Sequence, residues 1–301
     1  MHSKATLIIL AALLLHSCSQ SQNPQPPAQE TAAPTTAVTY GANPAVGKTF
    51  THDGIQLYYE VYGEGEPLVL IHGNGGSIRG LAAQIDHFRK RNKVIVMDSR
   101  DHGQSADSPG KITYELMTDD IAALIGHLGV GPVNVLGWSD GGIEALLLGI
   151  RHPDKVKKLA IMAANLSPSG IHPKAAEVLK RRISDFRIRY HLLESRREAK
   201  VAQMARDEPH IDAKALEAIT APALVMAGDH DLIADEHTLE IFHHLPNSQL
   251  CIFPNATHMV PYDNPVLFDT TVELFFDTPF VKKDRVEDLL KSVEKMLGLT
   301  R

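Results

Sequence analysis

The 301-residue sequence has few cysteines, a single tryptophan and no excess of positive charge. Its two cysteines allow at most one disulfide, so burial of apolar side chains must hold the fold. A chain of this length can hide roughly 70% or more of the surface that its unfolded form exposes. A net charge of −6 gives no general attraction for polyanions and no basic-aromatic motif is visible, which argues against nucleic acid as a partner.

An apolar run near the N-terminus is too short to span a membrane. Ala5–Leu15 has eleven residues, whereas a hydrocarbon core about 30 Å thick needs about 20. With Lys4 before it, the run is typical of a secretory signal peptide, which we place at residues 1–17. The tetrapeptide Leu15-His16-Ser17-Cys18 resembles a bacterial lipobox, in which the cysteine becomes the lipidated first residue of the mature chain.

The leader therefore predicts an exported bacterial lipoprotein, anchored to the membrane through Cys18 and facing the periplasm or the cell surface. Cleavage without lipidation would instead give a secreted or periplasmic protein. Residues 18–47 contain five prolines and one charged residue, Glu30, which predicts a disordered tether.

Beyond residue 47, short apolar runs alternate with segments of helical period. Strands without polar alternation, separated by helices, indicate a mostly parallel sheet covered on both faces. The predicted strands are Ile55–Tyr62, Pro67–Ile71, Lys93–Met97, Pro132–Leu136, Lys158–Met162, Ala223–Met226 and Gln249–Phe253. The predicted helices are Ile78–Lys90, Met117–Leu128, Gly142–Arg151, Glu236–Leu245 and Pro265–Phe276. One α/β domain is expected, with its core at 48–166 and 220–301.

Residues 167–219 interrupt this alternation with helical patterns, which predicts a cap inserted into the core. Between Lys174 and Arg206 the cap has ten Lys and Arg against four Asp and Glu. Solvated helix faces account for such a charge excess, and a basic lid for an anionic substrate or anionic lipid is the alternative. Lys282–Leu297 has its apolar residues on one face, which predicts a helix docked on the core.

The pentapeptide Gly137-Trp138-Ser139-Asp140-Gly141 directly follows a predicted strand and begins a predicted helix. A strand-to-helix turn this tight leaves no room for Cβ atoms on its flanks, and it exposes the serine hydroxyl at the carboxyl edge of the sheet. Ser139 is therefore the candidate nucleophile.

A serine hydroxyl needs a base, and the base needs an orienting group. His258 follows the last predicted strand, and Asp229 and Asp231 follow the strand before it. The order Ser139, Asp231, His258 is the nucleophile–acid–base order of the α/β-hydrolase fold.

Over Lys48 to Phe276 the chain resembles the α/β-hydrolases. The resemblance implies a mostly parallel eight-stranded sheet with helices on both faces and a small helical cap. It implies Asp231 as the acid, three residues after a glycine, and leaves Asp229 as a turn residue. It also implies that the backbone N–H groups of Asn74 and Asp140 form the oxyanion hole, and that His72 is structural.

The segment Asp98–Ser105 resembles the family's D-x-R-G-H-G-x-S loop, with Asp101 where glycine is usual. Asp tolerates left-handed backbone geometry better than most residues, so we expect the loop to form. His102, in the same loop, is expected to be structural.

The elbow Gly-Trp-Ser-Asp-Gly-Gly is similar to that of valacyclovir hydrolase and its biphenyl-hydrolase-like relatives. This resemblance implies substrate binding by Trp138 and by Asp140, whose carboxylate would pair with the α-amino group of an aminoacyl ester. A helix N-terminal carboxylate favoured by the helix dipole is the alternative for Asp140.

The expected function is hydrolysis of a small-molecule carboxylic ester through an acyl-enzyme, without metal or organic cofactor. Amide or lactone hydrolysis, haloperoxidase-like chemistry and carbon–carbon bond hydrolysis use the same three residues and stay open. A catalytically silent, tethered binding protein is the alternative of another class. The sequence makes no prediction of oligomeric state.

Overall fold

The computed structural model describes residues 38–188, 193–282 and 286–298. The predicted signal peptide, Cys18 and the first part of the predicted tether lie outside the described residues. Among the helices that are described, none is both long and apolar enough to cross a membrane.

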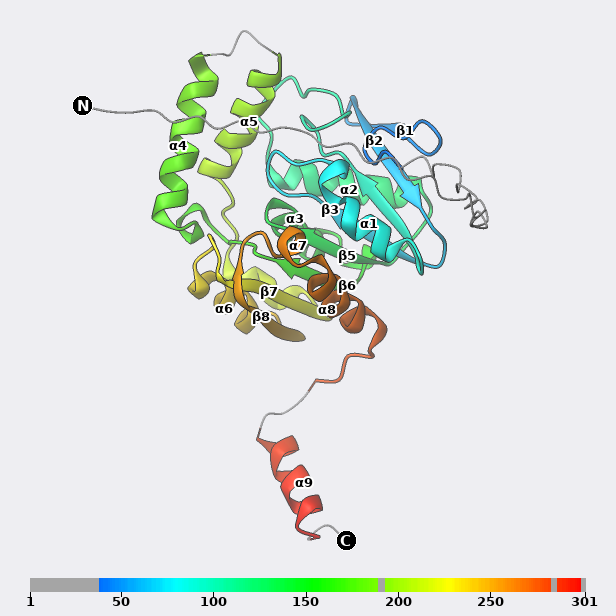
Figure 1. Ribbon diagram of the computed structural model, residues 1–301, viewed down its shortest axis with the longest axis vertical. Coiled ribbons are helices and arrows are strands. Elements are labelled where there is room, and N and C mark those ends of the chain that lie inside the picture. The colour runs from blue at the N-terminus through cyan, green and yellow to red at the C-terminus, as the bar shows by residue number, and fades with distance from the viewer. Residues whose placement is uncertain (1–37, 189–192, 283–285, 299–301) are drawn as a thin grey trace, which may run out of the picture. The chain divides into compact units, whose positions relative to one another are not determined.

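The strands form one eight-stranded sheet (Figure 1). They are β1 (Lys48–His52), β2 (Ile55–Tyr62), β3 (Glu66–Ile71), β4 (Asn92–Met97), β5 (Val133–Trp138), β6 (Val156–Met162), β7 (Ala223–His230) and β8 (Ser248–Thr257). Their order across the sheet is β1-β2-β4-β3-β5-β6-β7-β8. The pairs β1–β2 and β2–β4 are antiparallel and the others are parallel, which confirms the predicted fold class.

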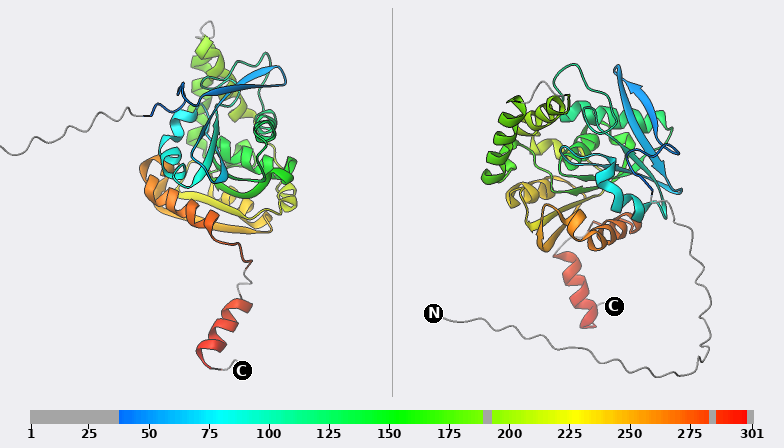
Figure 2. Two further views of the ribbon diagram at one scale, coloured as in Figure 1. Left: turned by 90° about the vertical axis from the view of Figure 1, so that its right-hand side faces the viewer. Right: turned by 45° about the horizontal axis from the view of Figure 1, so that its top comes forward.

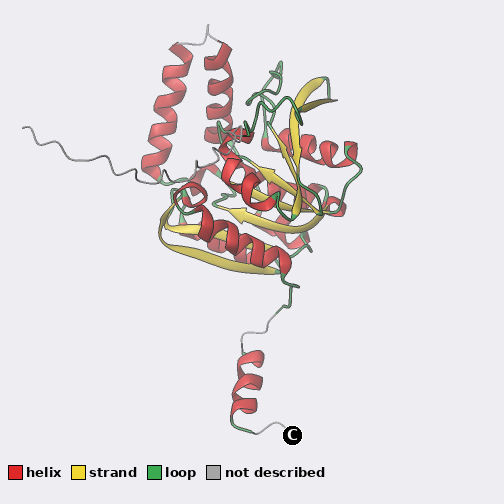
Figure 3. Cartoon of the chain, turned by 45° about the vertical axis from the view of Figure 1, so that its right-hand side comes forward, coloured by secondary structure: helices red, strands yellow, loops and turns green. Residues whose placement is uncertain are grey.

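Helices lie on both faces of the sheet (Figures 1 and 3). The α-helices of the described residues are α1 (Ala82–Phe88), α2 (Tyr114–His127), α3 (Asp140–Arg151), α4 (Pro173–Ile188), α5 (Leu193–Asp207), α6 (Asp235–His244), α7 (Val260–Asp263), α8 (Pro265–Asp277) and α9 (Glu287–Met296). Residues of α1, α2, α3, α6 and α8 pack in the apolar clusters beside the sheet. Short 3₁₀ helices are η1 (Ile78–Leu81), η2 (Pro153–Lys155), η3 (Pro168–Gly170) and η4 (Ala213–Ala218).

Both faces of the central strands are buried, because their side chains alternate between two apolar clusters. On β3, Val69 and Ile71 join the cluster that contains residues of α2, α3 and α6. Leu68 and Leu70 join the cluster that contains residues of α1 and α8. This double burial explains why the central strands lack polar alternation in the sequence.

Every predicted strand overlaps an observed one, but β1 is not among the predictions. Its sequence, Lys-Thr-Phe-Thr-His, has one apolar residue, Phe50, which is also its buried side chain. β1 pairs antiparallel with β2 at the edge of the sheet, where one-sided burial is typical.

The predicted cap segment contains α4 and α5, which pack against each other between β6 and β7 in the chain (Figures 1 and 2). The cap is also joined to the core by a backbone bridge between Ile171 and Ile233.

The predicted tether over 18–47 ends earlier than expected. Tyr40 is buried and its ring packs edge-on against Tyr62, with 5.0 Å between ring centroids. The backbone N–H groups of Gly41 and Asn43 each donate to the buried carboxylate of Glu60 at 2.9 Å. A buried carboxylate requires such donors, so Tyr40, Gly41 and Asn43 are attached to the core.

The predicted C-terminal helix is present as α9, but it is not docked as expected. Its apolar side chains are exposed, including Leu289 and Met296. The helical period indicates which face of a helix is apolar, but not what covers that face.

Candidate active site

Ser139 stands between the end of β5 and the start of α3. Its φ of 59° lies in the left-handed region, which non-glycine residues rarely adopt. A Cβ on Gly137 would lie 2.0 Å from the carbonyl oxygen of Gly141, and a Cβ on Gly141 would lie 2.3 Å from a carbonyl oxygen of β3. Both positions therefore require glycine, and the turn presents the serine hydroxyl at the N-terminus of α3.

Two residues that follow β7 and β8 continue a hydrogen-bond chain from this hydroxyl. His258 Nε2 lies 2.9 Å from Ser139 Oγ, and His258 Nδ1 lies 2.7 Å from Asp231 Oδ1. The Asp231 carboxylate also accepts from the backbone N–H groups of Gly228 at 3.2 Å and Ile233 at 3.0 Å. An ionised carboxylate only accepts, so Nδ1 carries the proton and Nε2 can accept one from Ser139. The structure brings the three predicted residues together.

Asp229 has a different set of partners. Its carboxylate accepts from the backbone N–H groups of Asn255 at 2.8 Å and Ala256 at 2.9 Å. The hydrogen bond with His230, followed by those two N–H groups, lowers the pKa of Asp229 to about 2. Asp229 thus ties β7 to β8, whereas Asp231 contacts the imidazole.

The two predicted oxyanion residues line the same cavity as Ser139. Asp140 is the first residue of α3, where backbone N–H groups have no intrahelical acceptor. Asn74 lies in the loop after β3, and its Nδ2 donates to Asp140 Oδ2 at 2.8 Å. A Cβ on Gly73 would lie 3.2 Å from Ser139 Cβ, so this loop packs directly against the elbow.

The Asp140 side chain is buried, with 6% of the residue exposed, and it lines the same cavity as Ser139. Burial raises the pKa of Asp140 to about 6, although hydrogen bonds from Asn74 and Tyr114 act in the opposite direction. One turn along α3, burial raises the pKa of Glu144 well above its usual range. Neither Glu144 carboxylate oxygen has a hydrogen-bond partner among the described residues.

A cavity of about 380 Å³ opens over Ser139. It is lined by Asn74, Tyr114, Trp138, Ser139, Asp140, Asn165, Ile171, Ala175, Val178, Ala205, Leu232, Ile233, His258 and Met259. The polar groups gather at the elbow, and the cap contributes apolar side chains from α4 and α5. Trp138 lines the cavity and donates from Nε1 to the His258 carbonyl oxygen at 3.0 Å, so it also supports the histidine loop.

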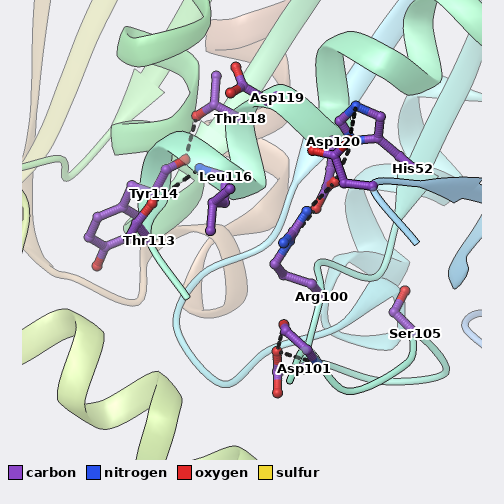
Figure 4. A network of polar contacts seen from close by, with 12 residues as sticks. His52, Arg100, Asp101, Ser105, Thr113, Tyr114, Leu116, Thr118, Asp119 and Asp120 are labelled. Atoms are coloured by element: carbon purple, nitrogen blue, oxygen red, sulfur yellow. Dashed lines mark hydrogen bonds and ion pairs between the residues drawn. The ribbon is translucent and has the colours of Figure 1, made fainter. Parts of the chain in front are cut away.

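The loop after β4 points two neighbouring side chains in different directions. Arg100 extends toward Asp120, with both hydrogen bonds at 2.7 Å, and Asp120 also contacts His52 (Figure 4). Asp101 has a φ of 61°, as expected for a residue in a glycine position. Its buried carboxylate accepts from Ser108.

The two histidines expected to be structural are buried near the elbow. His72 Nδ1 donates to the Gly73 carbonyl oxygen at 2.9 Å, and its Nε2 accepts from the Ser99 N–H at 3.1 Å. Burial lowers the pKa of His72, and it lowers the pKa of His102 to about 3. Both rings are therefore neutral scaffolding for the loops around the site.

Two polar residues of the cavity, Asn165 and Tyr114, are absent from the sequence prediction. Asn165 follows β6, so the strand-end rule that identified Asp231 and His258 would also have found it. Tyr114 is the first residue of α2. Its side chain is buried and forms a hydrogen bond with Asp140. In the sequence, Tyr114 resembles an ordinary core residue. No local pattern distinguishes it.

Comparisons with known proteins agree with this fold. Residues 66–200 match the family model described as "alpha/beta hydrolase fold". The chain is 37% identical over 105 residues to (E)-2-((N-methylformamido)methylene)succinate hydrolase of Acinetobacter baylyi, a match that covers 35% of this chain and 40% of that enzyme. It is 27% identical over 243 residues to serine hydrolase BPHL of Homo sapiens, covering 74% of this chain and 83% of BPHL.

Among solved structures, the α/β hydrolase MGS-M2 from a Medee basin deep-sea metagenome library has a TM-score of 0.71. The likeness covers 79% of this chain and all of that one at 20% identity, so it bears on the fold. The strand order, the partial match to the family model and the likeness to solved structures together show that the chain has the α/β-hydrolase fold.

Proposed function

We propose that the protein is a serine hydrolase that cleaves small-molecule carboxylic esters through an acyl-enzyme. The observation that carries this proposal is the hydrogen-bond chain from Ser139 Oγ through His258 to Asp231, with distances of 2.9 and 2.7 Å. This chain joins a nucleophile, the base that takes its proton and the carboxylate that orients the base.

In the proposed reaction, Ser139 Oγ attacks the ester carbonyl carbon while His258 Nε2 takes the hydroxyl proton. Asp231 stabilises the imidazolium that forms. The backbone N–H groups of Asn74 and Asp140 stabilise the tetrahedral oxyanion, each worth roughly 10²–10³ in rate. The His258 proton then goes to the leaving alkoxide, and an alcohol departs. A water molecule, deprotonated by His258, attacks the acyl-enzyme carbonyl carbon. The bond to Ser139 Oγ then breaks, the His258 proton returns to Oγ, and the carboxylic acid is released.

The size of the cavity favours a substrate with a small or medium-sized acyl group, which would bind under the cap. Its volume is about 380 Å³, and α4 contributes the apolar side chains Ala175 and Val178. Among the matched relatives, one is named as an (E)-2-((N-methylformamido)methylene)succinate hydrolase and another as an sn-1-specific diacylglycerol lipase. Amides, lactones and carbon–carbon bonds would use the same three residues, so substrate tests must include them.

A fluorophosphonate probe tests the activated serine directly. We expect the purified protein to be labelled and to hydrolyse p-nitrophenyl esters of short acyl chains, and Ser139→Ala to do neither. Ser169→Ala, an exposed cap serine, is the matched control and should behave like the wild type. A wild-type protein that is neither labelled nor active on esters, amides and lactones would favour the silent binding protein instead.

A second candidate, recognition of an α-ammonium group, is supported by the position of Asp140. Its carboxylate lines the cavity beside Ser139, and the elbow sequence resembles that of the biphenyl-hydrolase-like subfamily. We propose that Asp140 pairs with the amine of an aminoacyl ester. An equal kcat/KM for an aminoacyl ester and its des-amino analogue would contradict this.

We propose further that the mature protein is a membrane-anchored lipoprotein acylated at Cys18. The leader over residues 1–17 and the tetrapeptide that ends at Cys18 support this. Metabolic labelling with a fatty-acid analogue in a bacterial host should mark the wild type but not Cys18→Ala. Labelling of neither protein would favour export without lipidation.

A further inference from the structure

The side chain of Asn74 joins three parts of the molecule. Its Nδ2 donates to Asp140 Oδ2 at 2.8 Å and to the carbonyl oxygen of Val201 at 3.4 Å. An amide nitrogen carries two hydrogens, so both contacts can form at once. Asn74 belongs to the loop after β3, Asp140 to α3, and Val201 to the cap helix α5. One amide therefore links both predicted oxyanion residues to the cap.

Two cationic side chains near Val201 on α5, Arg197 and Lys200, bind to the core. Arg197 donates to the carbonyl oxygens of Gly103 and Ser105, each at 3.1 Å, and it also contacts Asp107. Residues at spacings of three and four share a helix face. This spacing places Arg197, Lys200 and Val201 together against the core.

Lys200 makes the most deeply buried of these contacts. Its Nζ lies 2.7 Å from Asp101 Oδ1, and the Asp101 side chain is fully buried. It also donates to the Ser108 carbonyl oxygen. The aspartate at the expected glycine position thus has a partner, and that partner comes from the cap. These contacts account for two cations of the basic cap segment.

We propose that the Asn74 side-chain amide is a positioning group through which the seating of α5 on the core, held by Lys200 and Asp101, sets the geometry of the oxyanion hole. Asp140 and Val201 hold the side chain of Asn74, and this restrains the backbone N–H of the same residue. When α5 is seated, the Asn74 and Asp140 N–H groups keep a fixed separation. This inference rests on the proposed serine-hydrolase function for its kinetic consequence, but the contacts are testable without it.

A double-mutant cycle distinguishes positioning through Asn74 from two independent structural effects. Asn74→Ala should lower kcat by about tenfold or more with little change in KM, since small displacements of reacting groups have effects of that size. Lys200→Met should lower kcat in the same direction. Because Lys200 acts through Asn74, the double variant should be no slower than Asn74→Ala alone. Losses in kcat that multiply would overturn the proposal, as would an Asn74→Ala enzyme with wild-type kcat.

Asn74→Asp gives a pH signature that a packing role alone would not produce. The introduced carboxyl would lie beside Asp140, with Tyr114 of α2, Glu144 of α3 and His258 facing the pair. At low pH the introduced carboxyl is protonated and can donate to Asp140 as the amide does, whereas two ionised carboxylates repel each other. The kcat of this variant divided by that of the wild type should fall as pH rises from about 5 to about 8. The same ratio for Asn74→Ala should stay constant, and a constant ratio for both would overturn the proposal.

Hydrogen exchange separates this inference from the proposed function. In the full-length protein, Asn74→Ala and Lys200→Met should each speed exchange of the α5 amides, whereas Lys180→Met should not. Lys180 forms an exposed ion pair with Glu177 on α4. A wild type without hydrolytic activity would refute the proposed function and leave this measurement valid. Unchanged α5 exchange in both variants would refute the link between Asn74 and the cap. If Lys200→Met does not fold, Lys200→Gln and Asp101→Asn replace it.

Discussion

The core side of the cavity and the cap side are built by different physical means. On the core side, Ser139, Asp231 and His258 each directly follow a strand, β5, β7 and β8. Parallel pairing of these strands with their neighbours brings their carboxyl ends to one edge of the sheet. On the cap side, α5 is held by side chains that reach from a helix face to the loop after β4.

The difference matters for how each side tolerates change. Backbone hydrogen bonds and strand register position the three residues of the core side. A side-chain substitution there should therefore remove a catalytic group without moving its neighbours. Charged side chains position α5. A substitution of one of them should therefore displace the helix and lower the reaction rate indirectly. Activity and stability measurements should therefore separate the two sides.

The largest effect is expected from Asp231→Asn on the core side. The amide can no longer hold His258 in the tautomer that accepts the serine proton, so kcat should fall by about 10⁴-fold. Folding should be preserved, as judged by circular dichroism. Asp229→Asn is the matched control two residues away, and it should retain most of the activity. A larger loss in kcat for Asp229→Asn than for Asp231→Asn would show that the acid has been misassigned.

On the cap side, Lys200→Met should reduce the free energy of unfolding by about 3 kcal/mol, because it leaves the buried Asp101 carboxylate without its cation. Asp101→Gly should have a smaller effect, since the left-handed φ of 61° suits glycine and the freed Lys200 side chain is 22% exposed. Urea unfolding of both variants and of the double variant checks this asymmetry. Losses that simply add in the double variant would mean that the ion pair is not what holds α5.

The same difference explains what the sequence can predict. The central strands, the elbow and the order of Ser139, Asp231 and His258 follow from local patterns and from the strand-end rule. The seating of α5 depends on Lys200 meeting Asp101, residues 99 positions apart in the chain. Neither residue stands out in its own neighbourhood. Asp101 is recognised as a departure from a glycine position, but the reason for the departure is a long-range contact.

The two ends of the described chain give the same lesson. A proline-rich composition predicts a tether up to residue 47, yet Tyr40 and the backbone of Asn43 pack against the core because Glu60 is buried there. The amphipathic pattern of α9 predicts a docked helix, yet its apolar face is exposed. In both cases the missing information is the identity of the opposing surface.

The buried carboxyl of Glu144, on α3 beneath the core side of the cavity, contrasts with the paired Asp101. Burial raises the pKa of Glu144 well above its unfolded value, so the wild type loses stability as pH rises above about 4.5 toward the folded-state pKa. Glu144→Gln removes this loss. Its advantage should be small at pH 5 and grow as pH rises toward the folded-state pKa of Glu144, by at most about 1.4 kcal/mol per pH unit. A pH-independent difference in urea unfolding would contradict this reasoning.

The smallest expected effect concerns substrate selection by Asp140, where the core side of the cavity contributes a charge. With a pKa raised to about 6 by burial, Asp140 is neutral at pH 5 and ionised at pH 7. If it pairs with an ammonium group, kcat/KM for an aminoacyl ester relative to its des-amino analogue should rise by about tenfold between these pH values. The ratio should fall again above about pH 8, where the α-amino group loses its proton. Asp140→Asn keeps the backbone N–H and should give a low ratio at every pH. A wild-type ratio that does not change with pH would leave the Asp140 carboxylate as a partner of Asn74 and Tyr114 alone, and the cavity would select its substrates by the apolar side chains of the cap.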